Sequence, residues 1–297
     1  MSRRFRLLAW AAAACTYLLI VLGAVVRITG SGLGCGEHWP RCHGRWFPPL
    51  DDVGTLIEWN HRLVAALVTV LVVGVAALAW WESRDRGWGM RDGAERLTAQ
   101  PPSRLTYVAL ALLITQILLG AVVVKLALPP WTVVLHLGTA MLLLATLLIL
   151  ATQPAGPLGF SPGFPPGFRP GSVVLGLAFV TVLFGALTAN LGAASACLGF
   201  PLCNGQLVPA GNYLQHLHWL HRLLGFALLA SLAWWAWRTR RAGVVAALVL
   251  VLLQIGIAAA MVLLALPRGL QVAHAAIGTA VWAALVLAAQ AESAPTP

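Results

Sequence analysis

Long apolar runs recur along the chain, and short polar segments separate them. A run of about 20 apolar residues is long enough to cross the hydrocarbon core of a bilayer as a helix. Eight such runs are expected to form helices: Leu7–Val26, His61–Trp81, Leu105–Val124, Trp131–Ala151, Val173–Ala194, His218–Trp237, Ala242–Leu266 and Leu270–Ala289. The pattern therefore predicts an all-α, polytopic membrane protein with eight transmembrane helices.

Composition supports a membrane protein. Hydrophobic residues make up 60% of the 297 positions and charged residues only 9%. Soluble domains carry about 25% charged residues. A water-soluble globule is therefore excluded.

The formal net charge of +10 follows the predicted topology rather than a nucleic-acid surface. If the N-terminus is cytoplasmic, the inner segments hold Arg3, Arg4, Arg6, Arg84, Arg86, Arg91, Arg96, Arg104, Arg169, Arg238, Arg240 and Arg241. The outer segments then hold only Arg27, Arg41, Arg45, Lys125 and Arg268. An excess of cytoplasmic cations is the usual rule for membrane proteins. We therefore expect both termini in the cytoplasm and no nucleic-acid partner.

The chain also repeats itself at matching positions. The matched segments are Leu22-Gly23-Ala24 with Phe184-Gly185-Ala186, His61-Arg62 with His221-Arg222, Gln116 and His136 with Gln254 and His274, and Leu126–Pro129 with Leu264–Pro267. Four helices per half is an even number, so both halves keep the same orientation in the membrane. We predict two pseudo-symmetric four-helix bundles, residues 1–152 and 172–297, joined by a Pro- and Gly-rich cytoplasmic linker, residues 153–171.

Four histidines are expected at the outer ends of the second, fourth, sixth and eighth helices: His61, His136, His221 and His274. An ionisable residue inside a membrane is by default a functional hypothesis. Two imidazoles from two helices at one depth suit a haem iron. Zinc or copper is less favoured, because structural zinc usually needs four ligands that include cysteine or carboxylate. The alternative is that these histidines only hydrogen-bond neighbouring helices.

Charged residues accompany the histidines. Arg62 and Arg222 would neutralise a haem propionate, or else hydrogen-bond carbonyls at a helix end. Glu58 precedes His61 by three residues on the same helical face, whereas the matched position in the second half is His218. The Glu58 carboxylate either complements a helix dipole in the first turn or is aimed at the occupant of the first site.

The second half offers a choice of imidazoles. His216 and His218 lie close to His221, so the ligand there is open, and we prefer His221 because it aligns with His61. Two further histidines in the first outer loop are expected to be solvated.

Two close pairs of cysteines lie in outer loops, Cys35 with Cys42 and Cys197 with Cys203. Outer loops face an oxidising compartment in which disulfides persist, so we expect two disulfides. Either could be a structural staple. Because Cys35–Cys42 lies beside the half that carries Glu58, it could instead exchange electrons or thiols with a partner.

Over nearly its whole length, this combination of helices, histidines and cysteine loops resembles the haem A synthases. The resemblance implies oxidation of a methyl group of haem O to the formyl group of haem A, for terminal oxidase assembly. It also implies a haem B cofactor on His221 and His274, the haem O substrate on His61 and His136, and Glu58 as an essential carboxylate. Cys35–Cys42 would then be the redox or haem-transfer pair, and Cys197–Cys203 the structural pair.

The same resemblance implies a bacterial cell membrane, haem sites toward its outer face, and a haem O synthase and an electron donor as partners. A homo-oligomer is compatible with the sequence. Three other readings compete. A di-haem cytochrome leaves Glu58 unexplained, and a membrane thiol–disulfide oxidoreductase leaves the histidines unexplained. A transporter would need a helix interrupted at mid-depth by Gly and Pro, and none is evident.

Overall fold

The structure is a computed structural model that describes residues 2–49, 51–88, 104–153 and 170–293. The elements in these ranges are α1 (Arg3–Thr29), α2 (Val53–Trp88), α3 (Arg104–Lys125), α4 (Pro130–Thr152), α5 (Pro170–Asn190), the short 3₁₀ helix η1 (Ala193–Ser195), α6 (Tyr213–Thr239), α7 (Ala242–Leu263) and α8 (Arg268–Ser293). The all-α prediction is confirmed. Most of the expected linker, residues 153–171, and Arg91, Arg96 and Arg169 lie outside the described residues.

Seven of the described helices are long and apolar enough to cross a membrane, which supports a multi-pass membrane protein. The helix that does not qualify is α6. Its first turns carry Gln215, His216, His218, His221 and Arg222. These polar side chains lower the hydropathy of the helix, so the eighth span remains a prediction.

α2 and α6 begin well before the apolar runs suggest, at Val53 and Tyr213, because polar caps start them. The Asp52 carboxylate accepts a hydrogen bond from the Thr55 amide (2.6 Å) just before α2, and Asn212 caps α6 at Leu214 (3.1 Å). Caps of this kind satisfy amides that a helix start leaves without partners. The Thr55 hydrogen bond holds the pKa of Asp52 below its usual value, so the cap persists at neutral pH and is lost as acid protonates the carboxylate.

Two helices end earlier than predicted. α5 stops at Asn190, and Gly192 then adopts a left-handed φ of 73°. α7 stops at Leu263, before Ala265 and Leu266 with φ of 57° and 63°. Residues that leave the right-handed region cannot continue an α-helix. The last apolar residues of the two runs therefore form a turn and η1 after α5, and a turn after α7.

The predicted duplication extends to backbone detail. Left-handed residues, which are uncommon outside glycine, fall at matched positions: Ala127 with Ala265, Leu128 with Leu266, and His43 with Asn204. The indole of Trp59 donates to the Trp46 carbonyl (3.0 Å) and that of Trp219 to the Leu207 carbonyl (2.7 Å). The two outer loops are thus copies of one structure.

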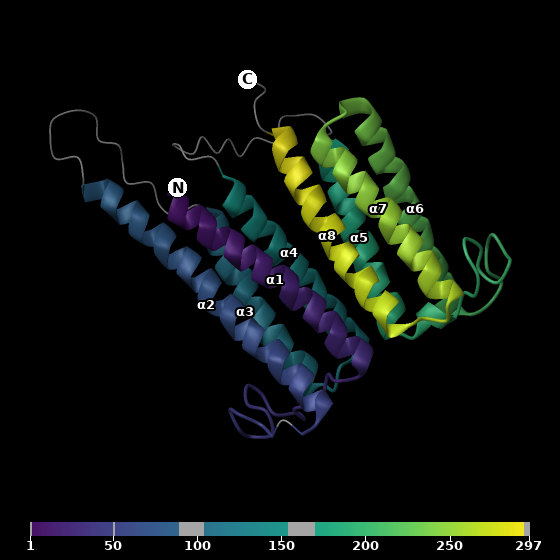
Figure 1. Cartoon of the computed structure of the whole chain (residues 1–297), viewed down its shortest axis with the longest axis horizontal. Coiled ribbons are helices and arrows are strands. Elements are labelled where there is room, and N and C mark those ends of the chain that lie inside the picture. The colour runs from purple at the N-terminus through teal and green to yellow at the C-terminus, as the bar shows by residue number, and fades with distance from the viewer. Residues whose placement is uncertain (1, 50, 89–103, 154–169, 294–297) are drawn as a thin grey trace.

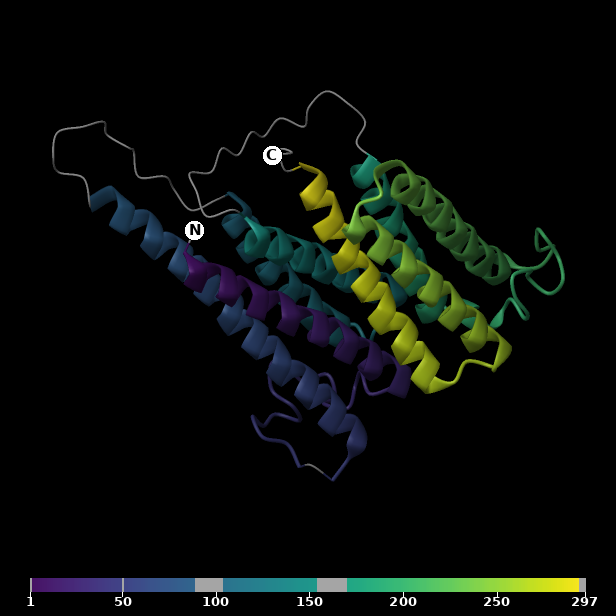
Figure 2. The same cartoon turned by 45° about the horizontal axis from the view of Figure 1, so that its top comes forward.

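Helices α1–α4 and α5–α8 lie on opposite sides of the molecule (Figures 1 and 2). They meet where α1 contacts α8 and α4 contacts both α5 and α8. Across this contact the Trp282 indole donates to the Met141 carbonyl (2.8 Å), and the Tyr17 hydroxyl donates to the Ala276 carbonyl (3.0 Å). In apolar surroundings such bonds are costly to leave unmade, so they hold the halves in one register.

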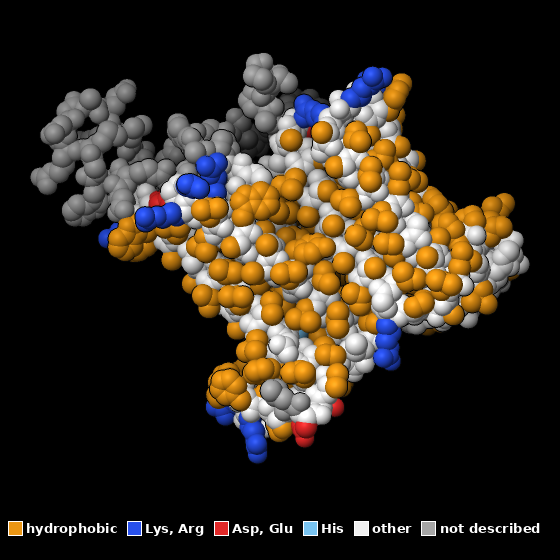
Figure 3. Space-filling view, in the orientation of Figure 1, with side chains coloured by type: hydrophobic (Ala, Val, Ile, Leu, Met, Phe, Trp, Pro, Cys, Tyr) orange, Lys and Arg blue, Asp and Glu red, His pale blue; other side chains and the backbone are white. Residues whose placement is uncertain are grey.

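Apolar side chains cover the sides of the molecule, and Lys and Arg gather toward its two ends (Figure 3). Leu118, Val70 and Val249 are each more than half exposed on different helices. A soluble protein rarely exposes apolar surface of this extent. The start of α1 and the end of α8 lie at one end, opposite the cysteine loops (Figure 1).

Candidate functional site

The four histidines lie at matched depths. His61 and His221 each follow the first residue of their helix by eight positions. His136 and His274 each follow theirs by six. Each predicted pair draws on two helices of one half, α2 and α4 in the first and α6 and α8 in the second. The structure therefore places the two members of each pair near the same end of one half, and their pairing on a ligand stays a prediction.

Small residues let three of these imidazoles lie against a neighbouring helix. A Cβ atom at Gly23 would come within 3.2 Å of the His61 ring, and one at Gly185 within 2.8 Å of the His221 ring. Gly120 stands in the same relation to His136, at 3.3 Å. At Gly185 a side chain would force the His221 ring to move, and at Gly23 and Gly120 it would crowd the ring.

Two glutamine side chains contact the rings of His136 and His274. The Gln116 amide nitrogen lies 3.1 Å from His136 Nε2, and the Gln254 amide nitrogen lies 3.0 Å from His274 Nδ1. The Gln254 amide also donates to the His274 carbonyl (2.9 Å). Both contacts join neighbouring helices, so each glutamine fixes the ring that follows it by 20 residues.

Several polar atoms around these pairs are buried without a protein partner: Nδ1 of His61, His136, His218 and His221, and Oε1 of Gln116 and Gln254. Buried polar atoms nearly always have a partner, and exceptions can indicate an absent ion or group. Imidazole nitrogen is a ligand for haem iron. The residues present therefore fit a haem in each half.

His216 and His218, the two further histidines near His221, differ in how exposed they are. His216 is exposed, and its Nδ1 contacts the Asn212 carbonyl at 3.0 Å. His218 is only 6% exposed, and the His221 ring lies against Gly185. His216 thus points away from the bundle, and the choice of ligand narrows to His218 or His221.

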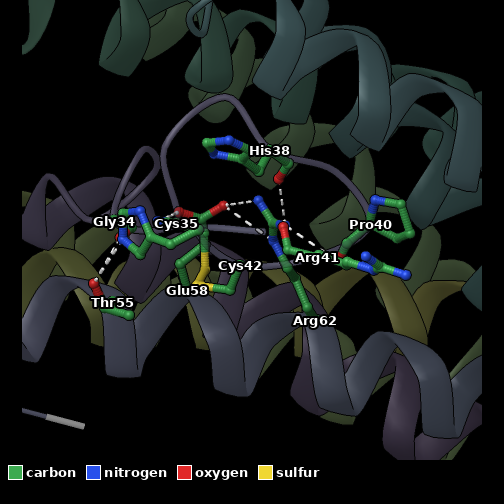
Figure 4. A network of polar contacts seen from close by, with 10 residues as sticks. Gly34, Cys35, His38, Pro40, Arg41, Cys42, Thr55, Glu58 and Arg62 are labelled. Atoms are coloured by element: carbon green, nitrogen blue, oxygen red, sulfur yellow. Dashed lines mark hydrogen bonds and ion pairs between the residues drawn. A yellow bond between two sulfur atoms is a disulfide. The ribbon is translucent and has the colours of Figure 1, made fainter. Parts of the chain in front are cut away.

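Glu58 lies at the centre of a polar network that joins α2 to the first outer loop (Figure 4). Its side chain is almost completely buried, with one oxygen accepting from the Cys35 amide (2.8 Å) and the other from Arg62 Nη2 (2.5 Å) and Nε (3.2 Å). The first turn of α2 holds no acidic residue. The interpretation of Glu58 as a helix-dipole partner is therefore wrong, because the helix begins at Val53.

Both arginines hold the outer loops. Arg62 Nη1 donates to the carbonyls of His38 (2.8 Å) and Arg41 (2.9 Å). Arg222 donates to the carbonyls of Leu202 (2.8 Å) and Cys197 (2.9 Å). These acceptors belong to the cysteine loops. One alternative expected the arginines to hydrogen-bond carbonyls at a helix end, and the structure does not place them there.

The structure contains both expected disulfides, Cys35–Cys42 and Cys197–Cys203, and all four residues are buried. In the first loop His43 Nε2 contacts the Gly34 carbonyl at 2.8 Å, which makes this histidine a loop contact rather than a member of the site.

Two features of the site were missed at the level of sequence. Gln116 and Gln254 were noted only for their spacing to His136 and His274, yet equal spacing in both halves already signals a shared partner. Glu58 and Arg62 are four residues apart, the spacing at which opposite charges meet on a helix. That spacing could have predicted their ion pair.

Fold and site together define a class: a duplicated helical membrane protein with one pair of half-buried histidines in each half. The family described as cytochrome oxidase assembly protein (COX15-CtaA) matches residues 6–286. The chain belongs to this family.

Curated relatives agree. The chain is 34% identical over 252 residues to the heme A synthase of Shouchella clausii, covering 80% of this chain and 79% of that protein. It is 34% identical to the heme A synthase of Alkalihalophilus pseudofirmus, covering 72% and 70%. The heme A synthase of Symbiobacterium thermophilum is 31% identical and covers 90% and 89%.

Proposed function

We propose that this protein is a haem A synthase, an enzyme that oxidises haem O to haem A in a membrane. One observation carries the proposal: a chain that aligns over most of its length with curated heme A synthases has a buried imidazole nitrogen without a protein partner on His61, His136 and His221. The reaction acts on a methyl group and yields a formyl group. Successive hydroxylations, with loss of water from the resulting diol, would account for the product.

We assign the two haems to different halves. His221 and His274 would hold haem B as a cofactor, and His61 and His136 would hold the haem O substrate. The support is the asymmetry at the matched positions Glu58 and His218, because only the first half places a buried carboxylate beside its pair. Haem B, when bound, supplies one-electron and oxygen chemistry.

The chain's own residues bind and orient the two groups. Gln116 and Gln254 fix the rings of His136 and His274 through the contacts described above. Glu58 would stabilise positive charge that develops as the methyl carbon is oxidised, or move a proton. The propionate role of Arg62 and Arg222 remains a proposal beside their observed role as loop anchors.

A second asymmetry suggests where substrate carboxylates bind. Arg41 and Lys125 line one hollow with Trp39 and Trp46 at the outer end of the first half. The matched positions of the second half hold Leu202 and Leu263 in place of the two cations. A substrate that enters and leaves needs a capture site for its propionates, whereas a resident cofactor does not.

Replacing Lys125 by Leu, the residue at the matched position, should raise the haem O concentration needed for half-maximal conversion by about fivefold, since an exposed ion pair is worth up to about 1 kcal/mol. Titration of haem O into membranes containing the variant measures this, with haem B content as a check. Arg268→Leu removes an outer cation from the second half and should change nothing. An unchanged concentration for Lys125→Leu contradicts the capture site.

The remaining assignments concern the membrane, the orientation of the chain in it and the partners. We propose a bacterial cell membrane with both termini in the cytoplasm, because Arg3, Arg4 and Arg6 begin α1 at the end opposite the cysteine loops. The haem sites then face outward. A haem O synthase would supply the substrate, and a separate donor would supply electrons.

The direct test is production of haem A. The gene is expressed in a bacterium that makes haem O but no haem A, and extracted haems are separated by chromatography. Haem A in the expressing cells, with none in cells carrying an empty vector, is the expected result. Full expression of a folded, haem-containing protein with no haem A would overturn the proposal.

A further inference from the structure

Arg62 joins a buried carboxylate to the first outer loop, whereas the matched arginine of the second half has no such carboxylate. Arg62 Nε and Nη2 donate to one oxygen of Glu58 (3.2 and 2.5 Å), and its Nη1 donates to the carbonyls of His38 and Arg41. A planar guanidinium can span two such acceptor groups because its N–H donors point in fixed directions. The residue thus links the buried carboxylate to the first outer loop (Figure 4).

The loop atoms in this network all belong to one closed ring. The Cys35–Cys42 disulfide closes residues 35–42, and the carbonyls of His38 and Arg41 lie inside that ring. The second oxygen of Glu58 accepts from the Cys35 amide at 2.8 Å, which is also part of the ring. Every hydrogen bond described here for Glu58 is therefore made to the ring or to an arginine that the ring binds.

The second half provides an internal comparison. Arg222 binds the ring closed by Cys197 and Cys203 through the carbonyls of Cys197 and Leu202. His218 replaces the carboxylate at the matched position. Anchoring a loop therefore accounts for the contacts of Arg222. Arg62 shares with it the bond to the residue just before the second cysteine, Arg41 matching Leu202, and makes an ion pair in addition.

We propose that Arg62 is a positioning residue: it ties the Glu58 carboxylate to the disulfide-closed ring, so that closure of the ring fixes where the carboxylate lies. This inference rests on the proposed function only for the role of the Glu58 carboxylate in haem O oxidation. The ring is a covalent constraint, and the two ends of the network, Cys35 and Arg62, hold the carboxylate from opposite sides.

Opening of the ring has a defined chemistry. A dithiol gives up two electrons and two protons, the Cys35–Cys42 sulfur–sulfur bond breaks to two thiols, and the dithiol becomes a disulfide. The Cys35 amide and the loop carbonyls are then free to move, and Glu58 loses its fixed partners. Conversely, Glu58 and Arg62 stabilise the closed ring against this reaction.

The first test measures that coupling without activity. Purified holoprotein is treated with a dithiol for set times, new thiols are alkylated, and the labelled cysteines are identified by peptide mass. Arg62→Gln and Glu58→Gln should each speed opening of Cys35–Cys42 by about tenfold, because hydrogen bonds to charged groups are the strong ones. Arg222→Gln is the matched control and should speed opening of Cys197–Cys203 only.

Arg62→Lys keeps the charge but cannot span both acceptor groups, so its rate should fall between wild type and Arg62→Gln. This milder variant keeps the test decisive if Arg62→Gln yields little protein. Unchanged opening of Cys35–Cys42 in both Arg62 variants overturns the inference.

The second test uses turnover. If Arg62 acts through Glu58, the double variant Glu58→Gln/Arg62→Gln should convert haem O no more slowly than Glu58→Gln alone, whereas independent effects would multiply. Multiplied losses overturn the positioning role. If no variant and no wild-type protein makes haem A, the proposed function fails, and the rates of ring opening still decide the coupling of Arg62 to the ring.

Discussion

Glu58→Gln should slow haem A formation severely while haem B stays bound. The substitution keeps the size of the side chain and removes its charge beside the first histidine pair. Loss of one preorganised electrostatic group costs about 10²–10³ in rate in enzymes that depend on it. We therefore expect at least about a hundredfold slower conversion of haem O, measured by chromatography of haems extracted from membranes over time.

Two controls separate charge at the site from general damage. Glu37→Gln removes an exposed carboxylate from the same loop and should leave conversion unchanged. The haem B content of Glu58→Gln should match that of wild type, because the second half is intact. Conversion by Glu58→Gln at the wild-type rate would refute an electrostatic or proton-transfer role for this carboxylate.

His274→Ala should remove haem B and with it all conversion. The variant would lose one of the two imidazoles proposed to hold haem B, and Gln254 loses the ring that it contacts at 3.0 Å. We expect haem B in the purified variant to fall about tenfold or more, since losing a partner of a metal ligand alone already costs 10–100-fold. Pyridine haemochrome spectra of equal amounts of protein give the content.

The matched variant in the other half is His136→Ala, which should keep haem B and lose bound haem O. His216→Ala alters an exposed histidine at the start of α6 and should keep both. Retention of haem B by His274→Ala together with its loss from His136→Ala would reverse the assignment of the two halves.

Much of the fold follows from the sequence because the bilayer imposes a simple rule. Apolar runs near 20 residues must form helices, since backbone groups in lipid need internal partners. The boundaries were less predictable because caps decide them. Asp52 and Asn212 start α2 and α6 well before the apolar residues begin, and this moves Glu58 from a first turn into the body of a helix.

The site was predictable where the same residues occur at matched positions of the two halves. Histidines at equal spacing in both halves indicated paired sites, and the pairing of cysteines followed from their proximity in two matching loops. The partners of charged groups were not predictable in the same way. The sequence leaves Arg62 open between a propionate and carbonyls at a helix end, but it meets the carbonyls of the ring, which turns at Gly36 (φ of 63°).

We propose that the two halves hold two different haems, a cofactor and a substrate. The most direct measurement is extraction and chromatographic identification of the haems in protein purified from cells that also make haem O. We expect haem B together with haem O or haem A, in equal amounts. Two haem B per chain, with neither haem O nor haem A, would contradict it and identify a di-haem cytochrome instead.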